Sequence, residues 1–264
     1  MTRLSYDEYR RHIDSESARL RAVLAGCDPA ARVPSCPDWD ARDLLGHHAG
    51  VLHFWATIVE QRPRGPEELE EPDKPTEYDE LLAFHERQAD RLVTALSAAD
   101  PGDAAWTWST EQTVGFTFRR QAHEALIHRL DAELAAGAVT PLDPALAADG
   151  VDEALDVMFG GTPAWGTFTG AGRFVRVDLT DRGESVWVEV GRFTGTDPDD
   201  GKTYDEDDIS AVPPPAAEPQ AVVTGPAAEL DAWLWRRGDA SDITITGADD
   251  VVAHFRSCVD HPIN

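Results

Sequence analysis

Three side chains that can bind or support a metal ion lie close together in one stretch of the sequence. Glu124 and His128 are four residues apart, and Asp131 follows three residues after His128. In a helix these spacings place side chains on one face, about one turn apart. Glu124 and His128 could therefore share one cation, and Asp131 could accept a hydrogen bond from the other imidazole nitrogen. The pattern predicts a helix-borne metal chelate, although a Glu four residues before a His is also common on charged helices without metal.

The stretch that carries these residues is a good helix former. Residues 119–136 are dominated by Ala, Leu, Glu and Arg and contain no Pro. Gly137 stands where a C-terminal cap is expected. We therefore predict a helix over residues 119–136, around which the other candidate elements are arranged.

Composition and charge bound the class of protein. The chain has 264 residues, 42% of them hydrophobic, with 8 Trp, which is enough for one large or two ordinary domains with real cores. Its net charge of −26 would be repelled by nucleic-acid phosphates and by an anionic membrane surface. We therefore expect partners that are small molecules, and neither nucleic acid nor membrane.

The lack of an apolar signal region and the pattern of cysteines predict a cytoplasmic protein. The first residues lack an apolar signal region, and no apolar run is long enough to span a bilayer. Cys27, Cys36 and Cys258 are odd in number and lack metal-site spacing, which is typical of reduced thiols. Cys36 precedes a predicted helix, where a thiol pKa can fall, but we favour a loop or packing role for it.

The amino-terminal half predicts a four-helix bundle. Apolar residues recur at helical spacing in three further segments, and Pro- and Glu-rich residues 62–74 read as a loop. The three predicted helices cover residues 5–26, 38–60 and 76–99. Bundles place metal sites on facing helices in their core, so one of the other helices should supply a further ligand.

The second predicted helix offers two neighbouring histidines as that ligand. His47 and His48 point about 100° apart on a helix, so only one can face the bundle interior. The apolar residues of this helix mark a face that is compatible with either. Periodicity alone leaves the choice open, and either histidine could instead be exposed or paired without metal.

The carboxyl-terminal half changes from helical to strand periodicity and predicts an α+β domain. The strands, at residues 173–179, 185–190, 221–225 and 243–245, are combined with helices at 143–159, 226–235 and 249–259. The first two strands should pair as a hairpin across residues 181–183. The predicted organisation is therefore a four-helix bundle at residues 1–140 and a small α+β domain with an antiparallel sheet at residues 141–264.

One segment of this half has the composition of a loop. Residues 194–219 hold a dense acidic run, at 197–208, and three consecutive prolines. We expect a mobile surface excursion there. The sequence leaves open whether the acidic run covers a site or only solvates the surface.

Three blocks of the amino-terminal half carry a resemblance to a known family. They are residues 36–39 (CPDW), 43–50 (DLLGHHAG) and 123–133 (HEALIHRLDAE). In this order they resemble the signature of the mycothiol-dependent maleylpyruvate isomerase family, which belongs to the DinB-like superfamily of metal-binding four-helix bundles and is widespread in actinobacteria. The resemblance implies His47, Glu124 and His128 as metal ligands, with Asp131 supporting the second His. It thereby favours His47 over His48.

The carboxyl-terminal half resembles the second domain of that family, which is similar to sterol carrier protein folds. Residues 233–239 (WLWRRGD) match a family pattern in which Gly precedes an Arg that holds the substrate anion. The resemblance places this role on Arg237, with Arg236 at the position of the Gly. The alternative is that both arginines only cap the end of a helix, where the dipole favours cations.

The resemblance also implies a reaction class. Two His and one Glu with an open fourth position are typical of catalytic zinc, although nickel, cobalt or iron(II) would accept them. In the family, mycothiol adds to an unsaturated dicarboxylate, the former double bond rotates, and the thiol leaves. The expected function is cis-trans isomerisation or thiol addition on a small electrophilic carboxylate, by a monomer or homodimer. Alternatives are a mycothiol S-transferase in detoxification or biosynthesis, a non-enzymatic small-molecule-binding protein, and a purely structural bundle.

Overall fold

The computed structural model describes residues 3–67, 69–261 and 263 of the chain. Two compact units divide it: Leu4–Leu142 forms the first, and the chain from Asp143 onward, with Arg3, forms the second. Residues 1 and 2 of the predicted first domain, and residue 68 of the predicted loop, lie outside the described residues.

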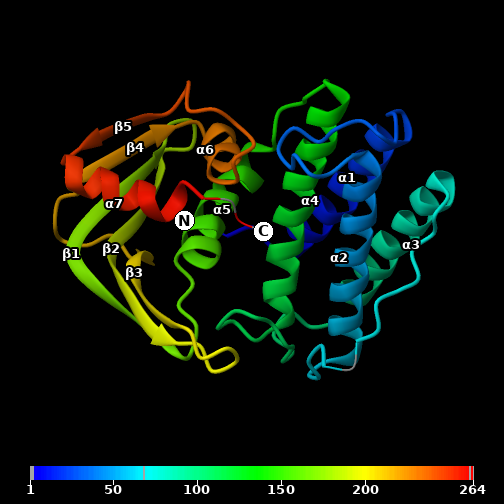
Figure 1. Cartoon of the computed structure of the whole chain (residues 1–264), viewed down its shortest axis with the longest axis horizontal. Helices are drawn as coiled ribbons and strands as arrows, with labels where there is room; N and C mark the ends of the chain where they lie inside the picture. The colour runs from blue at the N-terminus through cyan, green and yellow to red at the C-terminus, as the bar shows by residue number, and fades with distance from the viewer. Residues whose placement is uncertain (1–2, 68, 262, 264) are drawn as a thin grey trace. The chain divides into compact units, whose positions relative to one another are not determined.

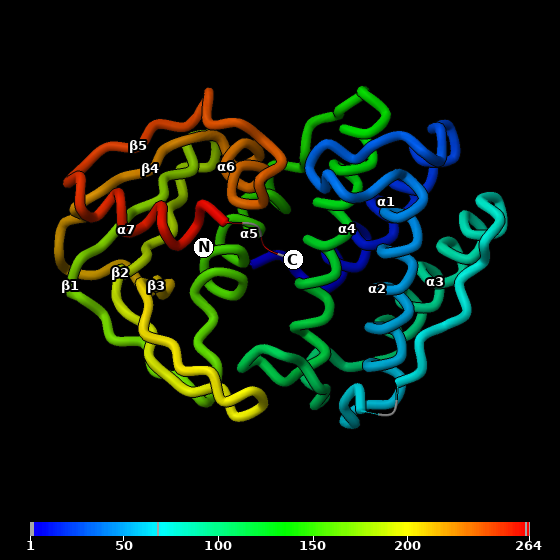
Figure 2. Tube along the Cα trace, viewed as in Figure 1, coloured from blue at the N-terminus to red at the C-terminus, as the bar shows by residue number. Residues whose placement is uncertain are grey.

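The first unit contains four long helices (Figure 1). They are α1 Tyr6–Ala25, α2 Ala41–Gln61, α3 Tyr78–Ser97 and α4 Val114–Ala136. The trace in Figure 2 shows them side by side, with α1 against α4 and α2 against α3 as the most extensive contacts. Contacts of α1 with α3 and of α2 with α4 close the bundle, and α1 barely meets α2. The predicted four-helix architecture is confirmed.

Local capping chemistry fixes where α1 and α2 begin. Ser5 and Glu8 form the predicted capping box of α1, in which the Ser5 backbone N–H donates to the Glu8 carboxylate at 2.8 Å. Helix α2 begins at Ala41, later than predicted, because Asp40 and Asp43 form its capping box. Helix α3 begins after Glu77 without a side-chain cap, so the predicted start at Thr76 is wrong.

Helix α4 is longer than its sequence pattern predicts. It begins at Val114 instead of residue 119, because the preceding irregular segment is held by a bridge between Ala104 and Thr113 and the chain turns into the helix directly afterwards. It ends where predicted: Gly137 adopts φ 68°, the left-handed conformation that glycine reaches without steric cost.

The second unit is built on a five-stranded sheet. The strands are β1 Gly166–Leu179, β2 Glu184–Thr196, β3 Thr203–Val212, β4 Ala221–Gly225 and β5 Thr244–Gly247. Their order is β3-β2-β1-β4-β5, and only the β1–β4 pair is parallel. The predicted hairpin is confirmed: β1 and β2 pair antiparallel, with Val175 opposite Val188. The α+β class is confirmed as well, with a mostly antiparallel sheet.

Helices complete the second unit. They are α5 Pro144–Glu153, which continues as the π-helical turn η1 Ala154–Phe159, then α6 Ala227–Leu234 and α7 Asp249–Val259. Helix α7 packs across the sheet and contacts β1, β2, β3 and β5 (Figure 1). Its buried Val251 and Phe255 fill the space between helix and sheet.

Half of the segment at residues 194–219, which the sequence predicts as a mobile excursion, is β-strand instead. Strand β3 covers residues 203–212 of it, and β2 itself extends to Thr196. Acidic residues are unfavourable in strands in general, but Arg192 of β2 bridges Asp205 and Asp207 of β3, both at 2.9 Å. Ile209, two residues beyond Asp207 on the same face of the strand, is fully buried. Cross-strand charge pairing and this one apolar anchor therefore place the later part of the acidic run, residues 203–208, in an edge strand.

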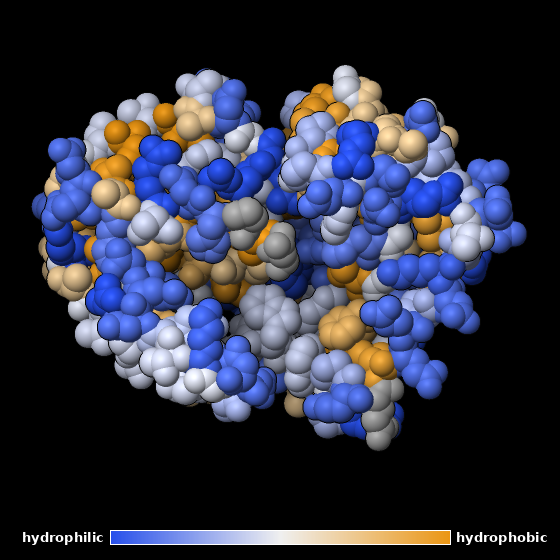
Figure 3. Space-filling view, viewed as in Figure 1, coloured by the Kyte–Doolittle hydropathy of each residue, from blue (hydrophilic) through white to orange (hydrophobic). Residues whose placement is uncertain are grey.

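The surface agrees with the acidic composition. Figure 3 shows a face on which hydrophilic side chains predominate and apolar patches are small. In the described part of the chain, no helix has the length and apolar character needed to cross a bilayer. The three cysteines are free thiols, and burial raises the pKa of the Cys258 thiol to about 12.

Candidate metal centre

Helices α2 and α4 bring His47, Glu124 and His128 together. One potential ligand atom from each residue lies within 4.8 Å of the others. Glu124 Oε1 lies 3.1 Å from His128 Nε2 and 3.7 Å from His47 Nε2. The rings of His47 and His128 meet edge to face, with centroids 5.0 Å apart. The four-residue spacing on α4 thus produces the face that the sequence predicts, and α2 supplies the third group.

Asp131 holds the ring of His128 from the opposite side. His128 Nδ1 and Asp131 Oδ2 are 2.9 Å apart, as the three-residue spacing predicts. Asp131 is fully buried, and the Ser35 hydroxyl donates a hydrogen bond to its other carboxylate oxygen. With Nδ1 engaged in this way, Nε2 of His128 is directed at Glu124 and His47. The tautomer that a metal ligand needs is therefore set by protein groups.

Two further residues, which the sequence analysis did not identify, pack against the cluster. Arg120 Nη2 contacts Glu124 Oε2 at 3.2 Å, which leaves Oε1 facing the two histidines. The Trp39 ring packs against His47, with centroids 4.6 Å apart. The four-residue spacing between Arg120 and Glu124 was a usable signal. No local spacing links Ser35 or Trp39 to α4.

The charges of the cluster are strongly coupled. Burial disfavours the ionised forms of both Glu124 and His128. The negative charge of Glu124 and the hydrogen bond to Asp131 nevertheless raise the pKa of His128 to about 9. The charge of His128, hydrogen bonds from both histidines and Arg120 hold the pKa of Glu124 well below its usual range. Without metal the cluster is therefore an ion pair, and a divalent cation would replace the proton of His128.

His48 lies outside the cluster. Its Nδ1 is 2.8 Å from His85 Nε2 of α3, and both rings are buried. Burial, with repulsion from the neighbouring histidines, holds the pKa of His48 well below its ordinary value. The choice that periodicity left open is therefore made by α3, which provides a partner for His48 and leaves His47 to face α4.

We expect His85 to make stability depend on pH. Burial lowers the pKa of His85 to about 3, so the folded state keeps it neutral while the unfolded chain binds a proton below about pH 6.5. The contribution of neutral, buried His85 to the free energy of unfolding is full above pH 6.5 and is lost as the pH falls towards 3. In that range the free energy of unfolding should fall by up to about 1.4 kcal/mol per pH unit because of this one group. Urea unfolding of the native chain and of His85→Gln between pH 7.5 and 4.5 should show a smaller slope for the variant. His12→Gln, on α1, is the control, and equal slopes for native chain and His85→Gln would contradict the prediction.

Arg237 belongs to the second unit, just beyond the end of α6. Its Nη1 donates to the Trp235 carbonyl oxygen at 2.6 Å, as the helix-capping alternative predicts. Arg236 adopts φ 63°, in the left-handed region that favours glycine. The position where the family pattern has Gly is therefore one whose backbone conformation suits Gly. The role of Arg237 toward a substrate anion stays a prediction.

Sequence comparison decides the family. Residues 10–133 match the model of the mycothiol maleylpyruvate isomerase N-terminal domain, and residues 145–254 match the C-terminal domain of the same enzyme. The chain belongs to the mycothiol-dependent maleylpyruvate isomerase family. The family resemblance noted in the sequence is thereby confirmed. A comparison with curated proteins gave no match.

Solved structures of the family share the fold. The crystal structure of a mycothiol-dependent maleylpyruvate isomerase aligns with a TM-score of 0.60 at 15% identity, over 93% of this chain and 96% of that one. A His-to-Ala mutant of the isomerase aligns with a TM-score of 0.61 at 16% identity over the same shares. The likeness establishes the isomerase fold for this chain.

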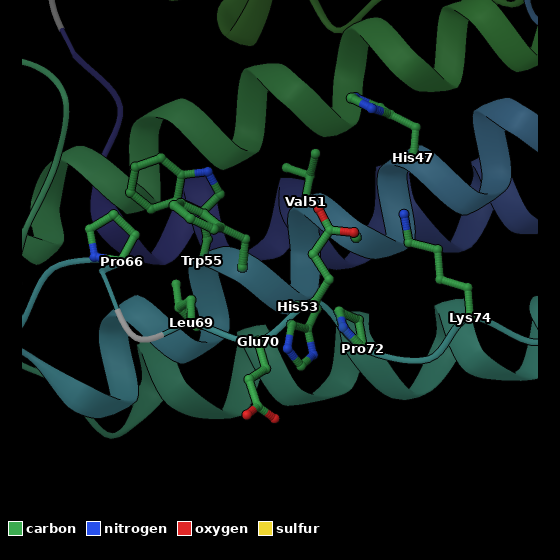
Figure 4. A pocket seen from close by; sticks show the side chains of 12 residues that line it. His47, Val51, His53, Trp55, Pro66, Leu69, Glu70, Pro72 and Lys74 are labelled. Atoms are coloured by element: carbon green, nitrogen blue, oxygen red, sulfur yellow. The ribbon is translucent and has the colours of Figure 1, made fainter. Parts of the chain in front are cut away.

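A cavity and a groove within the first unit open beside His47. The cavity, of about 380 Å³, follows α2 and is covered by the segment between α2 and α3 (Figure 4). The groove, of about 630 Å³, is lined by Trp39, Arg42 and Gly46 among others. His47 and Lys74 line both of them. A small molecule therefore has room next to a candidate ligand of the cluster.

Proposed function

We propose that this protein is a metal-dependent enzyme that uses mycothiol as its thiol cofactor and acts on a small electrophile that carries a carboxylate. The observation that carries the proposal is the cluster of His47, Glu124 and His128 beside an accessible cavity. Two imidazoles and one carboxylate suit zinc and leave a further coordination position for an exchangeable ligand. Membership of the isomerase family supports the choice of thiol.

The three donor groups lie close enough together to share one divalent cation. The three donor atoms are already within 4.8 Å of one another, and Asp131 and Arg120 hold the outward sides of His128 and Glu124. When bound, zinc would supply a Lewis acid that lowers the pKa of a thiol and holds it as thiolate. His47, Glu124 and His128 would hold the ion, and Asp131 would orient His128.

The remaining proposed roles concern the substrate. Arg237 would bind a substrate carboxylate, for which a planar guanidinium is well suited. The reaction class is addition of the thiol across an electrophilic double bond. Elimination of the thiol after rotation gives an isomerase, whereas retention of the new carbon–sulfur bond gives a mycothiol S-transferase. The cysteines of the chain take no part.

Turnover assays with the zinc-loaded chain test this proposal. Maleylpyruvate and a panel of unsaturated carboxylates should react only when mycothiol is added. An isomerase leaves the free thiol concentration unchanged, whereas a transferase consumes one thiol for each substrate molecule, so titration of free thiol separates the two. Equal rates with and without mycothiol, or no turnover of any member of the panel, would count against the enzyme and favour a small-molecule-binding protein.

A further inference from the structure

The cavity beside His47 is polar at one end and apolar at the other. It extends along α2 from His47 to Trp55, a separation of eight residues or about 12 Å of helix. Figure 4 shows His47 and Lys74 at one end, and Trp55, Pro66 and Leu69 at the other. A ligand that fills this cavity must therefore combine a polar head near the metal ligands with an apolar body.

Lys74 supplies a positive charge at the polar end. It is one of only two lysines in the chain, with Lys202 in the second unit. Its ammonium points toward α2 (Figure 4), and a Cβ placed on Gly50 would lie only 3.0 Å from Nζ. Within the described residues, no carboxylate forms an ion pair with Lys74. The charge is therefore available to an anionic ligand.

Gly50 explains why the ammonium can lie so close to the helix. A glycine inside a helix costs about 1 kcal/mol relative to alanine, and α2 contains Gly50 one turn after His47. The absent Cβ leaves room for the end of the Lys74 side chain, whose Cε would otherwise lie 3.3 Å away. The helix is thus locally less stable at Gly50, the position where the Lys74 ammonium lies against the end of the cavity that contains His47.

The far end of the cavity is an aromatic and aliphatic wall. Phe54 and Trp55 line it, and Trp55 packs in turn against Trp106 and Phe116, with ring centroids 6.3 and 6.0 Å away. Trp55 is only 5% exposed, so its ring is fixed by the bundle. Such a wall suits a flat apolar ring.

Two acidic side chains work against a second anionic group. Glu70 and Glu71 line the same cavity and are exposed. A carboxylate placed beyond Lys74 would face these charges or lose its hydration against the apolar wall, and both effects disfavour it. A compact dicarboxylate would also leave the apolar end unfilled.

We infer that the substrates of this protein are amphipathic monocarboxylates carrying an apolar ring, with the carboxylate on Lys74 and the ring against Phe54 and Trp55, and that compact dicarboxylates are poor ligands. The inference rests on the proposed function, because it names the substrate class of the same site. It assigns the recognition of the single substrate carboxylate to Lys74, in place of the role proposed for Arg237.

The two lysines allow a direct measurement of ligand binding on the full, zinc-loaded chain. Reductive ¹³C-methylation keeps both ammonium groups charged and gives each an NMR signal, which Lys74→Arg and Lys202→Arg assign. Cinnamate, an unsaturated carboxylate with a phenyl ring, should shift the Lys74 signal in a saturable way and leave that of Lys202 unchanged. Maleate should bind at least about tenfold more weakly, because it lacks the ring.

Variants separate the role of the charge from that of the cavity. Lys74→Gln should raise the dissociation constant of cinnamate about 10- to 100-fold, as expected for loss of a charged hydrogen bond. The same variant should bind the neutral cinnamyl alcohol as the native chain does. Lys202→Gln is the matched control and should bind both like the native chain. Tighter binding of maleate than of cinnamate, or native cinnamate affinity in Lys74→Gln, would overturn the inference.

The titration is repeated on metal-depleted protein to separate this inference from the proposed function. If the chain binds no zinc but cinnamate still shifts the Lys74 signal, the proposed metal enzyme fails and the amphipathic site stands. If zinc binds and mycothiol-dependent turnover is found while cinnamate leaves Lys74 unchanged, the enzyme stands and the substrate class is wrong.

Discussion

Purified without a histidine tag, the native chain should carry about one zinc ion, and His47→Ala and Glu124→Ala should each carry almost none. Each variant leaves two donors from a set of three, and zinc sites of this kind depend on all three. Loss of Glu124 also removes the negative charge that faces both histidines at 3.1 and 3.7 Å. Metal content measured by mass spectrometry checks this, and thiol-dependent turnover should be lost in parallel.

Graded variants distinguish ligands from supporting residues. Asp131→Asn keeps the shape of the side chain that holds His128 Nδ1 at 2.9 Å. It should weaken zinc binding about 10- to 100-fold, as loss of an outer partner usually does. His12→Ala, on α1 outside the cluster, should retain native zinc content. A native chain free of metal after purification without chelators would remove the enzymatic proposal and place the small-molecule-binding protein first.

Replacing Arg129 should cause a large loss of stability in the first unit. Glu133 is fully buried between α1 and α4 and accepts hydrogen bonds from Arg19 and Arg129, both at 2.9 Å, and from the Thr140 backbone at 2.8 Å. Burial opposes its ionisation, but these hydrogen bonds lower the pKa of Glu133 below its ordinary value. Arg129→Met would remove one of the two guanidinium groups that compensate the buried Glu133 carboxylate. It should lower the free energy of unfolding by about 3–5 kcal/mol.

Two further variants test the cause of that loss. Arg129→Met combined with Glu133→Leu removes both buried charges and should recover much of the stability, because the penalty comes from a buried carboxylate that has lost one of its two guanidinium partners. Arg10→Met removes an exposed pair with Asp7 at 3.4 Å and should change the unfolding free energy by less than about 1 kcal/mol. Denaturant unfolding measures all three. A double variant no more stable than Arg129→Met would show that packing, and not the stranded charge, causes the loss.

The choice between isomerase and transferase depends on events after the thiol has added to the substrate. His47, Glu124, His128 and Asp131 would have the same roles in both, so the metal cluster does not separate them. The nature of the cavity matters more, because the family fold is shared at only 15–16% identity with the isomerase structures. An apolar wall and a single lysine would give this chain a different substrate from that of a compact dicarboxylate enzyme.

Local sequence patterns determined the helical half and the chemistry of one of its faces. The spacing of Glu124, His128 and Asp131 was sufficient to place three side chains on one side of α4, since helical geometry is set by the backbone. The Ser5–Glu8 capping box and Gly137 marked the start of α1 and the end of α4 for the same local reason. The period of two in the second half likewise predicted the β1–β2 hairpin.

Contacts between distant residues decided the rest. His47 and His48 are equivalent to a periodicity argument, and only the approach of His85 from α3 makes His48 a buried partner and leaves His47 for Glu124. Ser35 reaches Asp131 from 96 positions away. The later part of the acidic run became strand β3 because Arg192 of the neighbouring strand compensates its charge. Spacing along the chain fixes which side chains share a face, but burial and charge compensation depend on which face another element brings opposite, and that is a property of the tertiary structure alone.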